Sequence, residues 1–430
     1  MQQKEATFIT VLALIGVLTA MPLALGGGLY IPFFVLFVIT AYLMVFHWRQ
    51  LSNRDLIFLS CCFGLLVVNL LFSGIDGFID QMKALLQLMA AFCLAVFVPK
   101  IFSALGRKRL HAILVWAVSI VVMLTIFERL GVTKEISDSW RQFAFQGTGF
   151  TDPYASDARD LAMVGYIRPK VFAPEPAFLA GFLFLCFACL SLITRDARTT
   201  VFVLGANVLC WFLIGSPVLL LSLAAVTLTL LYRFRSQLIY ALPVLLLGAL
   251  ILLIRPPEAV SSGLNSIEAR FSWIVSGDER FLKDDSVRSR VYVPFAIGVP
   301  AALDHNAFWG VGIGGKERLS QMVDPNYSHY STGIGSTENT LGTNSLGSML
   351  ATLGIIGTVI LIALVIWYWS PVGAAPLLLG LLSVFLFLFT QGAYETQSFW
   401  FGVFLIVGAA GIYKTESLSM QASEVTDTTK

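Results

Sequence analysis

Two side chains that can do chemistry stand seven residues apart in the middle of the sequence. Arg168 and Glu175 begin and end the string Arg-Pro-Lys-Val-Phe-Ala-Pro-Glu, and Pro174 and Pro176 restrict the backbone on both sides of the carboxylate. Arginine binds phosphate through two parallel N–H donors, and a partly desolvated carboxylate can act as a general base. The structural alternative is that Glu175 complements the dipole of the following helix, for about 0.3–1 kcal/mol.

A second set of candidate residues lies further along the chain. Arg288 and Arg290 precede a short apolar stretch, where the alternative to a binding role is pairing with neighbouring aspartates or lipid headgroups. The glycine run 310–315 lacks the flanking strand and helix spacing of a dinucleotide-binding loop, so it indicates a tight, exposed backbone. Asn344 then opens an apolar run rich in small residues, which let helices approach closely.

The cysteines do not have the spacing of a metal site or a disulfide framework. All six lie inside apolar segments, where thiols behave as small hydrophobic side chains. Cys186 and Cys189 have CxxC spacing, but they stand within an apolar run and no second ligand pair is nearby. We therefore predict no metal and no other cofactor.

The elements that must position these residues are apolar. Hydrophobic residues make up 57% of the 430 residues and charged residues only 13%, and the mean hydropathy is +0.81, which a soluble domain does not reach. Apolar blocks recur from residue 7 to residue 413, which predicts a single transmembrane domain, 1–413, followed by a polar tail, 414–430. The net charge of +2, without a large basic cluster, argues against nucleic acid as a partner.

Span lengths predict an all-α, polytopic membrane protein. A spanning helix needs about 20 apolar residues, because the hydrocarbon core is roughly 30 Å thick. Residues 199–232 form one apolar block, which Gly215, Ser216 and Pro217 divide into two spans. The chain then holds about 12 transmembrane helices, which we place at 7–25, 29–46, 56–73, 81–101, 110–130, 172–194, 199–214, 217–232, 237–254, 341–366, 372–391 and 397–413.

Basic residues in the short loops predict the orientation. With a cytoplasmic N-terminus, every short basic loop falls on the cytoplasmic side, and these loops carry Arg49, Arg54, Lys100, Arg107, Lys108, Arg109, Arg195, Arg198, Arg233 and Arg235. We expect a bacterial inner-membrane protein with both termini in the cytoplasm and two large periplasmic loops, 131–171 and 255–340. In the second loop, 261–277 has the spacing of a surface helix, and 291–303 suits an interfacial or re-entrant piece.

Four motifs in order resemble those of the Wzy-type O-antigen polymerases and their O-antigen ligase relatives. They are the Arg-x6-Glu-Pro string, an arginine after a serine in the late outward loop, the GxGxG turn, and an Asn-containing helix with Gly-Ile-Ile-Gly. This family joins lipid-linked glycans at the outer face of the bacterial inner membrane, with undecaprenyl pyrophosphate as the leaving group. Two positions depart from the pattern: Ala177 replaces a serine or asparagine, and Thr343 replaces the histidine typical of ligases, which favours a polymerase.

The resemblance implies roles for the candidate residues. Glu175 would be the base or would orient the acceptor, with His305 and His329 as alternative bases. Inversion of the anomeric centre is expected, because no second carboxylate motif suggests a covalent intermediate. The implied substrate ligands are Arg168, Arg288, Arg290 and Asn344. The implied partners are undecaprenyl-pyrophosphate-linked glycans, the lipid bilayer, a chain-length regulator and a flippase.

Two other functions remain as alternatives. An O-antigen ligase would transfer the glycan to lipid A core in a single addition. A lipid-linked-sugar transporter would be expected to carry ionisable residues near mid-membrane and repeated halves with broken helices. The predicted spans contain almost no ionisable residue, since Glu128, Glu175 and Glu395 stand at span ends, and no internal repeat is evident. This pattern argues against transport.

Overall fold

The protein is a bundle of apolar helices in the part of the chain that its computed structural model describes. That part comprises residues 1–26, 29–31, 33–73, 78–145, 157, 160–161, 167–194, 196–233, 288–322, 344–390 and 394–411. The prediction of an all-α fold is confirmed there, apart from one short antiparallel hairpin. In this hairpin β1 (Leu23–Gly26) pairs with β2 (Leu29–Ile31), and Leu23 lies opposite Ile31.

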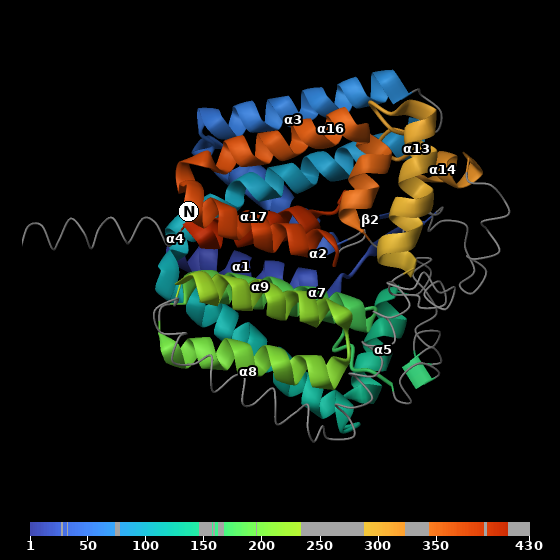
Figure 1. The fold of residues 1–430 in the computed structure, drawn as a ribbon. Helices are drawn as coiled ribbons and strands as arrows, with labels where there is room; N and C mark the ends of the chain where they lie inside the picture. Colours follow the sequence, from blue (N-terminus) through green and yellow to red (C-terminus); the bar gives the residue numbers. More distant parts are fainter. Residues whose placement is uncertain are drawn as a thin grey trace, which may run out of the picture.

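The long helices run alongside one another, and three short ones lie at the same end of the bundle (Figure 1). The short ones are α5 (Lys134–Phe145), α13 (Val299–Asn306) and α14 (Lys316–Met322), with α5 apart from the other two. A π-helical segment, η3 (Arg288–Gly298), leads into α13. The long helices are α1 (Gln3–Thr19), α2 (Phe34–His47), α3 (Asn53–Ser73), α4 (Phe78–Arg129), α7 (Pro176–Ile193), α8 (Ala197–Ile214), α9 (Pro217–Arg233), α16 (Ser345–Trp369), α17 (Ala374–Leu388) and a last helix, Gln397–Gly411.

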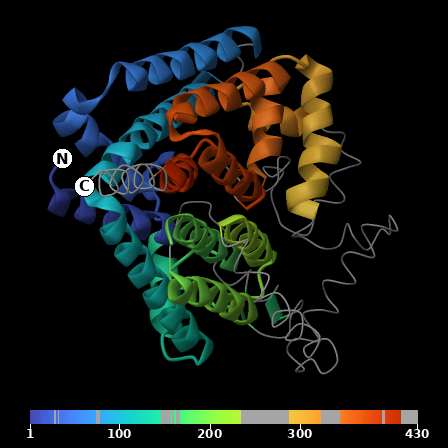
Figure 2. The ribbon, with the colours of Figure 1, turned by 60° about the vertical axis from the view of Figure 1, so that its left-hand side comes forward.

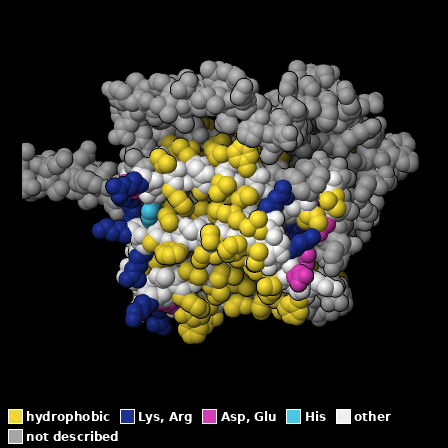
Figure 3. Space-filling model, turned by 90° about the horizontal axis from the view of Figure 1, so that it is seen from below, with side chains coloured by type: hydrophobic (Ala, Val, Ile, Leu, Met, Phe, Trp, Pro, Cys, Tyr) yellow, Lys and Arg dark blue, Asp and Glu magenta, His cyan; other side chains and the backbone are white. Residues whose placement is uncertain are grey.

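Length and composition make the bundle suitable for a membrane. In the described part of the chain, four helices are long and apolar enough to cross one, namely α3, α4, α7 and α16, and five shorter apolar helices accompany them. Figure 3 shows a broad band of apolar side chains on one face, with Lys and Arg gathered at one rim and charges of both signs at the other. Such a band between charged rims is typical of a membrane-embedded surface.

The helices follow the predicted spans closely. Each span contains a helix except 237–254, which lies outside the described residues, as does the predicted surface helix 261–277. The division of 199–232 is confirmed, because Gly215 ends α8 with a φ of +63° and α9 starts at Pro217. The boundaries of the first two spans are wrong. Helix α1 ends at Thr19 and α2 starts only at Phe34, because the chain between them turns back as the β1–β2 hairpin.

Helix α4 joins two groups of helices. It covers two predicted spans and breaks at Gly106, whose φ of +67° and ψ of 162° are not helical. Its first half lies beside α3, and its second half runs alongside the green α7–α9 group (Figure 2). At the centre of the molecule is α7, in which every residue from Leu179 to Ile193 is buried.

Helix α16 is interrupted at Gly354, whose φ of +68° and ψ of −174° break the helical hydrogen bonds. The turn 307–315 supplies the missing partners. The amides of Ile355 and Ile356 donate to the carbonyls of Ala307 and Phe308, each at 3.2 Å. In return, the amides of Val311 and Gly312 donate to the carbonyls of Ala351 and Thr352, at 2.9 and 3.0 Å. Backbone N–H and C=O groups that lose their helical hydrogen bonds inside an apolar bundle need other hydrogen-bond partners.

The glycine run 310–315 is therefore packed inside the protein. Gly310, Gly312 and Gly315 are buried, and a Cβ on Gly310 would overlap the backbone of Ala351. The predicted tight turn is confirmed, but the expectation that it is exposed is wrong. Asn69 of α3 fixes the turn: its amide donates to the carbonyls of Trp309 and Thr352, at 2.8 and 3.2 Å, and its oxygen accepts from the amide of Ile313 at 3.0 Å.

Candidate functional site

The candidate site is the segment 167–175, which leads into α7 at the end of the bundle that carries α5. Two of its residues, Val171 and Phe172, have left-handed backbones with φ values of +47° and +63°. This conformation is uncommon for any residue other than glycine and costs most for a β-branched one such as Val171. It persists only where surrounding contacts hold it, and strain of this kind clusters at functional sites.

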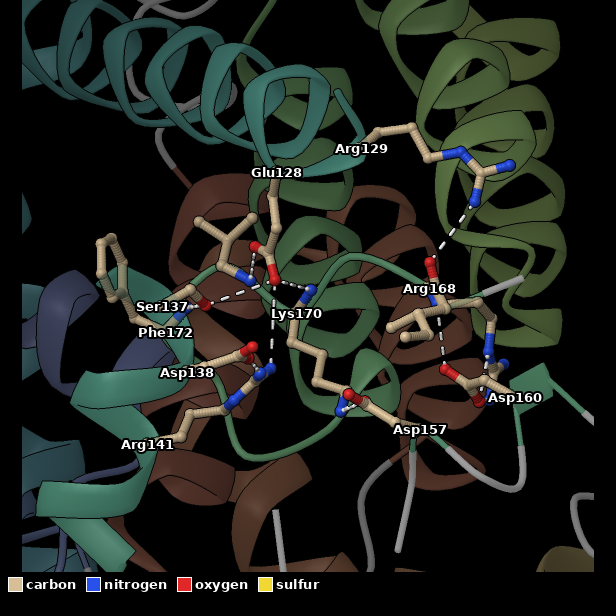
Figure 4. Close-up of polar contacts among 12 residues, drawn as sticks. Glu128, Arg129, Ser137, Asp138, Arg141, Asp157, Asp160, Arg168, Lys170 and Phe172 are labelled. Carbon is tan, nitrogen blue, oxygen red and sulfur yellow. Dashed lines mark hydrogen bonds and ion pairs between the residues drawn. The ribbon is translucent and has the colours of Figure 1, made fainter. Parts of the chain in front are cut away.

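Glu128, in the last turn of α4, supplies the main contacts (Figure 4). One carboxylate oxygen accepts from the amide of Val171 at 2.6 Å, and the other accepts from the amide of Lys170 at 3.2 Å. The next amide, that of Phe172, donates to the hydroxyl of Ser137 at 3.2 Å. Ser137 in turn donates to Glu128 at 3.3 Å. Three successive amides therefore point at a buried carboxylate and its hydroxyl neighbour, as in an anion-binding nest.

Helix α5 turns its polar side toward this carboxylate. Arg141 is 2% exposed and forms ion pairs with Asp138 and, at 3.9 Å, with Glu128. The sequence reasoning missed α5, which lies inside the predicted outward loop 131–171. The available signal was the spacing of Ser137 and Arg141, which places both on one face of a helix, together with a carboxylate at the end of the preceding span.

Lys170 is a fully buried cation in the same cluster. Its ammonium forms an ion pair with Asp157. Burial lowers the pKa of this ammonium below its ordinary value, and the nearby Arg141 lowers the pKa further, while the hydrogen bond to Asp157 offsets part of the effect. A buried cation with a lowered pKa beside several carboxylates is a feature of functional sites and also of structural ion-pair networks.

Arg168 is held by Asp160. Its Nε and Nη2 donate to one carboxylate oxygen at 2.9 and 2.5 Å, and its backbone amide donates to the other at 3.1 Å. Arg129 of α4 donates to the carbonyl of Ile167 at 3.4 Å, next to this pair. Since an arginine has five N–H donors, the Asp160 contacts orient the guanidinium and leave others that can bind a phosphate.

Glu175 occupies the N-cap position of α7, half-buried, with Pro176 at the first helical position. Its carbonyl accepts from the amides of Phe178 and Leu179, at 3.1 and 3.4 Å. Among the described contacts, its side chain accepts no capping hydrogen bond from the first turn of α7. Capping by the side chain is therefore not its role in this conformation.

The other predicted site residues belong to a second group, around α13 and α16. Asn344 is buried and caps α16, with its side-chain oxygen accepting from the amide of Gly347 at 3.0 Å. His305 is exposed in the last turn of α13. The structure describes Arg288 and Arg290 only as backbone at the start of η3, and His329 lies outside the described residues.

A buried polar cluster at the opposite end of the bundle joins α3, α4 and α16. The carboxylate of Asp55 accepts from the ammonium of Lys100 and from the hydroxyl of Tyr368, both at 2.6 Å. It also accepts from the amide and hydroxyl of Ser52, at 2.6 and 2.7 Å. With each of these donors supplied by the protein itself, the cluster is suited to holding helices together. In the part of the chain that the structure describes, no group of three or more His, Cys, Asp or Glu residues could hold a metal ion.

Comparisons with protein families and with curated protein sequences find no match for the chain. No protein-family model matches it, and no curated protein sequence is significantly similar to it. The sequence motifs and the chemistry of the cluster around segment 167–175 are therefore the features that bear on the function of the chain.

Proposed function

We propose that the chain is a membrane glycosyltransferase that polymerises undecaprenyl-pyrophosphate-linked oligosaccharide repeat units into O-antigen or a related surface polysaccharide. The observation that carries the proposal is the strained segment 167–175. It bears Arg168, Lys170 and Glu175 at one end of an apolar bundle, where Glu128 of α4 and Ser137 of α5 hold its backbone. A lipid-linked substrate presents its phosphates and sugars at this level, just outside the hydrocarbon core.

The chemistry requires little of the protein. The donor already has a good leaving group, so the site has to hold two anionic phosphates and make one acceptor hydroxyl nucleophilic. In the proposed step the hydroxyl oxygen bonds to the anomeric carbon of the donor, and the bond from that carbon to the pyrophosphate oxygen breaks. Glu175 takes the hydroxyl proton, and undecaprenyl pyrophosphate leaves with its electron pair. Direct attack of this kind inverts the anomeric centre.

Arg168 is the residue we assign to the phosphates within segment 167–175. Its Nε and Nη2 are oriented by Asp160, so the guanidinium pays little further ordering cost when its other donors bind an anion. Arg288 and Arg290 are proposed as further ligands from the α13–α16 side. The groups around α5 and α13 lie at the same end of the bundle (Figure 1), so both would face the same side of the membrane.

We further propose the twelve-span topology, with both termini in the cytoplasm of a bacterial inner membrane and the 131–171 and 255–340 loops in the periplasm. The one-sided basic loops support this orientation. A chain-length regulator and a flippase are the partners such a polymerase would need. A transporter is less well supported, because no buried charged residue in the described part of the chain lies midway along a long helix. Asp55 and Glu128 stand at the ends of α3 and α4, and Lys170 lies outside the helices.

One experiment separates these functions. Purified full-length protein in lipid nanodiscs is incubated with a synthetic undecaprenyl-pyrophosphate repeat unit, and the products are separated by size. A ladder of products supports the polymerase. A single addition, seen only when lipid A core is supplied, would identify a ligase instead. Absence of any glycosyl transfer by folded protein with both acceptors would overturn the proposed enzymatic function.

A further inference from the structure

Helix α5 buries two polar residues and exposes two large apolar ones. The polar residues Ser137 and Arg141 are 1% and 2% exposed, because they face the Glu128 carboxylate. The large apolar residues Ile136 and Phe143 are 62% and 71% exposed. These two stand seven residues apart and therefore lie on the same side of the helix. Facing water, this side would expose large apolar side chains to solvent.

The apolar side of α5 follows, along the chain, a stripe of exposed apolar residues on α4. Exposed apolar residues recur on the second half of α4 at intervals of four and three residues, which places them on one face of that helix. The stripe consists of Trp116, Ile120, Met123, Phe127 and Leu130. Val132, in the link to α5, is also exposed. Since α4 is one of the helices apolar enough to cross a membrane, this stripe is the surface that lipid would cover.

The direction of α5 differs from that of the spans. Figure 1 shows α5 lying across the end of the bundle, while the second half of α4 runs along it. If the bundle crosses a bilayer, α5 then lies in the plane of the bilayer surface. The remaining exposed positions on α5 are polar, namely Glu135, Ser139 and Gln142, and they lie on the side of the helix away from the buried face. The helix thus has three sides: one on the protein, one apolar and one polar.

We infer that α5 is an interfacial helix whose apolar side, Ile136 and Phe143, inserts into the acyl chains of the adjacent leaflet. Its polar exposed side faces the headgroups and water, and its buried side holds Glu128 and, through it, segment 167–175. The helix would therefore set the depth of that segment relative to the membrane surface. This inference rests on exposure and continuity with the α4 stripe, and it holds whether or not the chain is a glycosyltransferase.

Spin labels in lipid nanodiscs test the inference on the full-length chain. Single cysteines replace Ile136 or Phe143, and the matched controls are Glu135→Cys and Gln142→Cys, which are exposed neighbours on the polar side. Cys61, the exposed native thiol, is first changed to Ser, and the absence of background labelling is checked on this parent. For each label, collision rates are measured with oxygen, which concentrates in acyl chains, and with a water-soluble nickel chelate.

The expected result is an oxygen-to-nickel collision ratio several-fold higher at positions 136 and 143 than at positions 135 and 142. Equal ratios at all four positions would overturn the inference, because the apolar side would then face water. Labels at 136 and 143 that are immobilised and shielded from both reagents would also overturn it. That result would mean that a second copy of the chain or another protein covers this side of α5.

Discussion

The carboxylate of Glu128 accepts a 2.6 Å hydrogen bond from the amide of Val171, a residue 43 positions later in the chain. The contact links the end of α4 to a backbone conformation that valine rarely adopts. Glu128 is itself 8% exposed and its oxygens are occupied by protein donors. It therefore acts as a positioning residue for the segment that carries Arg168 and Glu175.

Replacing Glu128 should impair activity, because the backbone amides of Lys170 and Val171 would lose their hydrogen-bond partner. We expect Glu128→Ala to lower polymerisation by about 10²-fold, because a shift of about 1 Å in a reactive group has an effect of this size. Glu128→Gln keeps one oxygen acceptor for the amides and should lose less. Product ladders and thermal unfolding are measured together, with the exposed Glu135→Gln as the control. The positioning role is excluded if Glu128→Ala is folded and polymerises like the wild type.

The Glu175→Gln substitution tests the proposed base. It retains size and most hydrogen bonding but removes the proton affinity, so we expect polymerisation to fall by about 10²–10⁴-fold while lipid-linked donor still binds. If Glu175 only complements the dipole of α7, the loss is at most about 1 kcal/mol of stability, with activity intact. Asp196→Asn, at the N-cap of α8, is a matched control that should leave activity unchanged. His305 and His329 would be examined next if Glu175→Gln remained active.

The free energy of unfolding should depend on pH because Lys170 is buried. Burial lowers its pKa in the folded protein, whereas the unfolded chain takes the ordinary value of 10.5. Between these two pKa values the unfolded state binds more protons, so the free energy of unfolding rises with pH across that window. Lys170→Met should remove this rise. Thermal unfolding of both proteins across the alkaline range measures it, and parallel curves for the two proteins would contradict the prediction.

Two glycines with similar φ values allow the stability cost of backbone strain to be measured separately from the cost of steric overlap. Gly106 and Gly310 have φ values of +67° and +64°, but a Cβ on Gly106 meets nothing within 4 Å, whereas one on Gly310 overlaps the Ala351 backbone. Gly106→Ala should cost about 1–3 kcal/mol from strain alone. Gly310→Ala should cost clearly more and reduce the yield of folded protein. Equal unfolding temperatures for the two variants would show that the turn 307–315 can move away from α16.

Thiol labelling tests the proposed orientation of the bundle. Ser103 and Gln321 are both exposed, and they lie on opposite sides of the membrane in the proposed topology. A cysteine at 321, or near Thr148 in the first large loop, should react with an impermeant reagent from the periplasm, and one at 103 should not. Labelling at 103 alone would invert the topology.

The sequence located the helices well because their signal is local. Runs of apolar residues gave the spans, and Gly215 with Pro217 gave a helix boundary that the structure confirms. The hairpin of β1 and β2 was missed, because its strands are short apolar segments that periodicity alone does not distinguish from the ends of helices. Helix α5 was missed for another reason: it is short and polar on average, and it lies inside a segment that was assigned to an outward loop, so its amphipathic pattern was not searched for.

The candidate site was only partly predictable. Arg168 and Glu175 were identified from residue type and from the flanking prolines. The function of Glu128 could not be inferred in the same way, because its partners are the backbone amides of Lys170 and Val171, and nearly every residue type provides such an amide. Asn344 was assigned to substrate, but a buried asparagine that caps a helix has the same sequence signal, and only the bond to Gly347 reveals the cap.

The break in α16 has a mechanical consequence. The part of the helix before Gly354 is bonded to the turn 307–315 through the carbonyls of Ala351 and Thr352. The part after Gly354 is bonded to the same turn through the amides of Ile355 and Ile356, and it continues to Tyr368, whose hydroxyl donates to Asp55 at the far end of the bundle. The turn therefore replaces helical hydrogen bonds on both sides of the break. Because α13 leads directly into this turn, a shift of α13 would be transmitted to both parts of α16 at once.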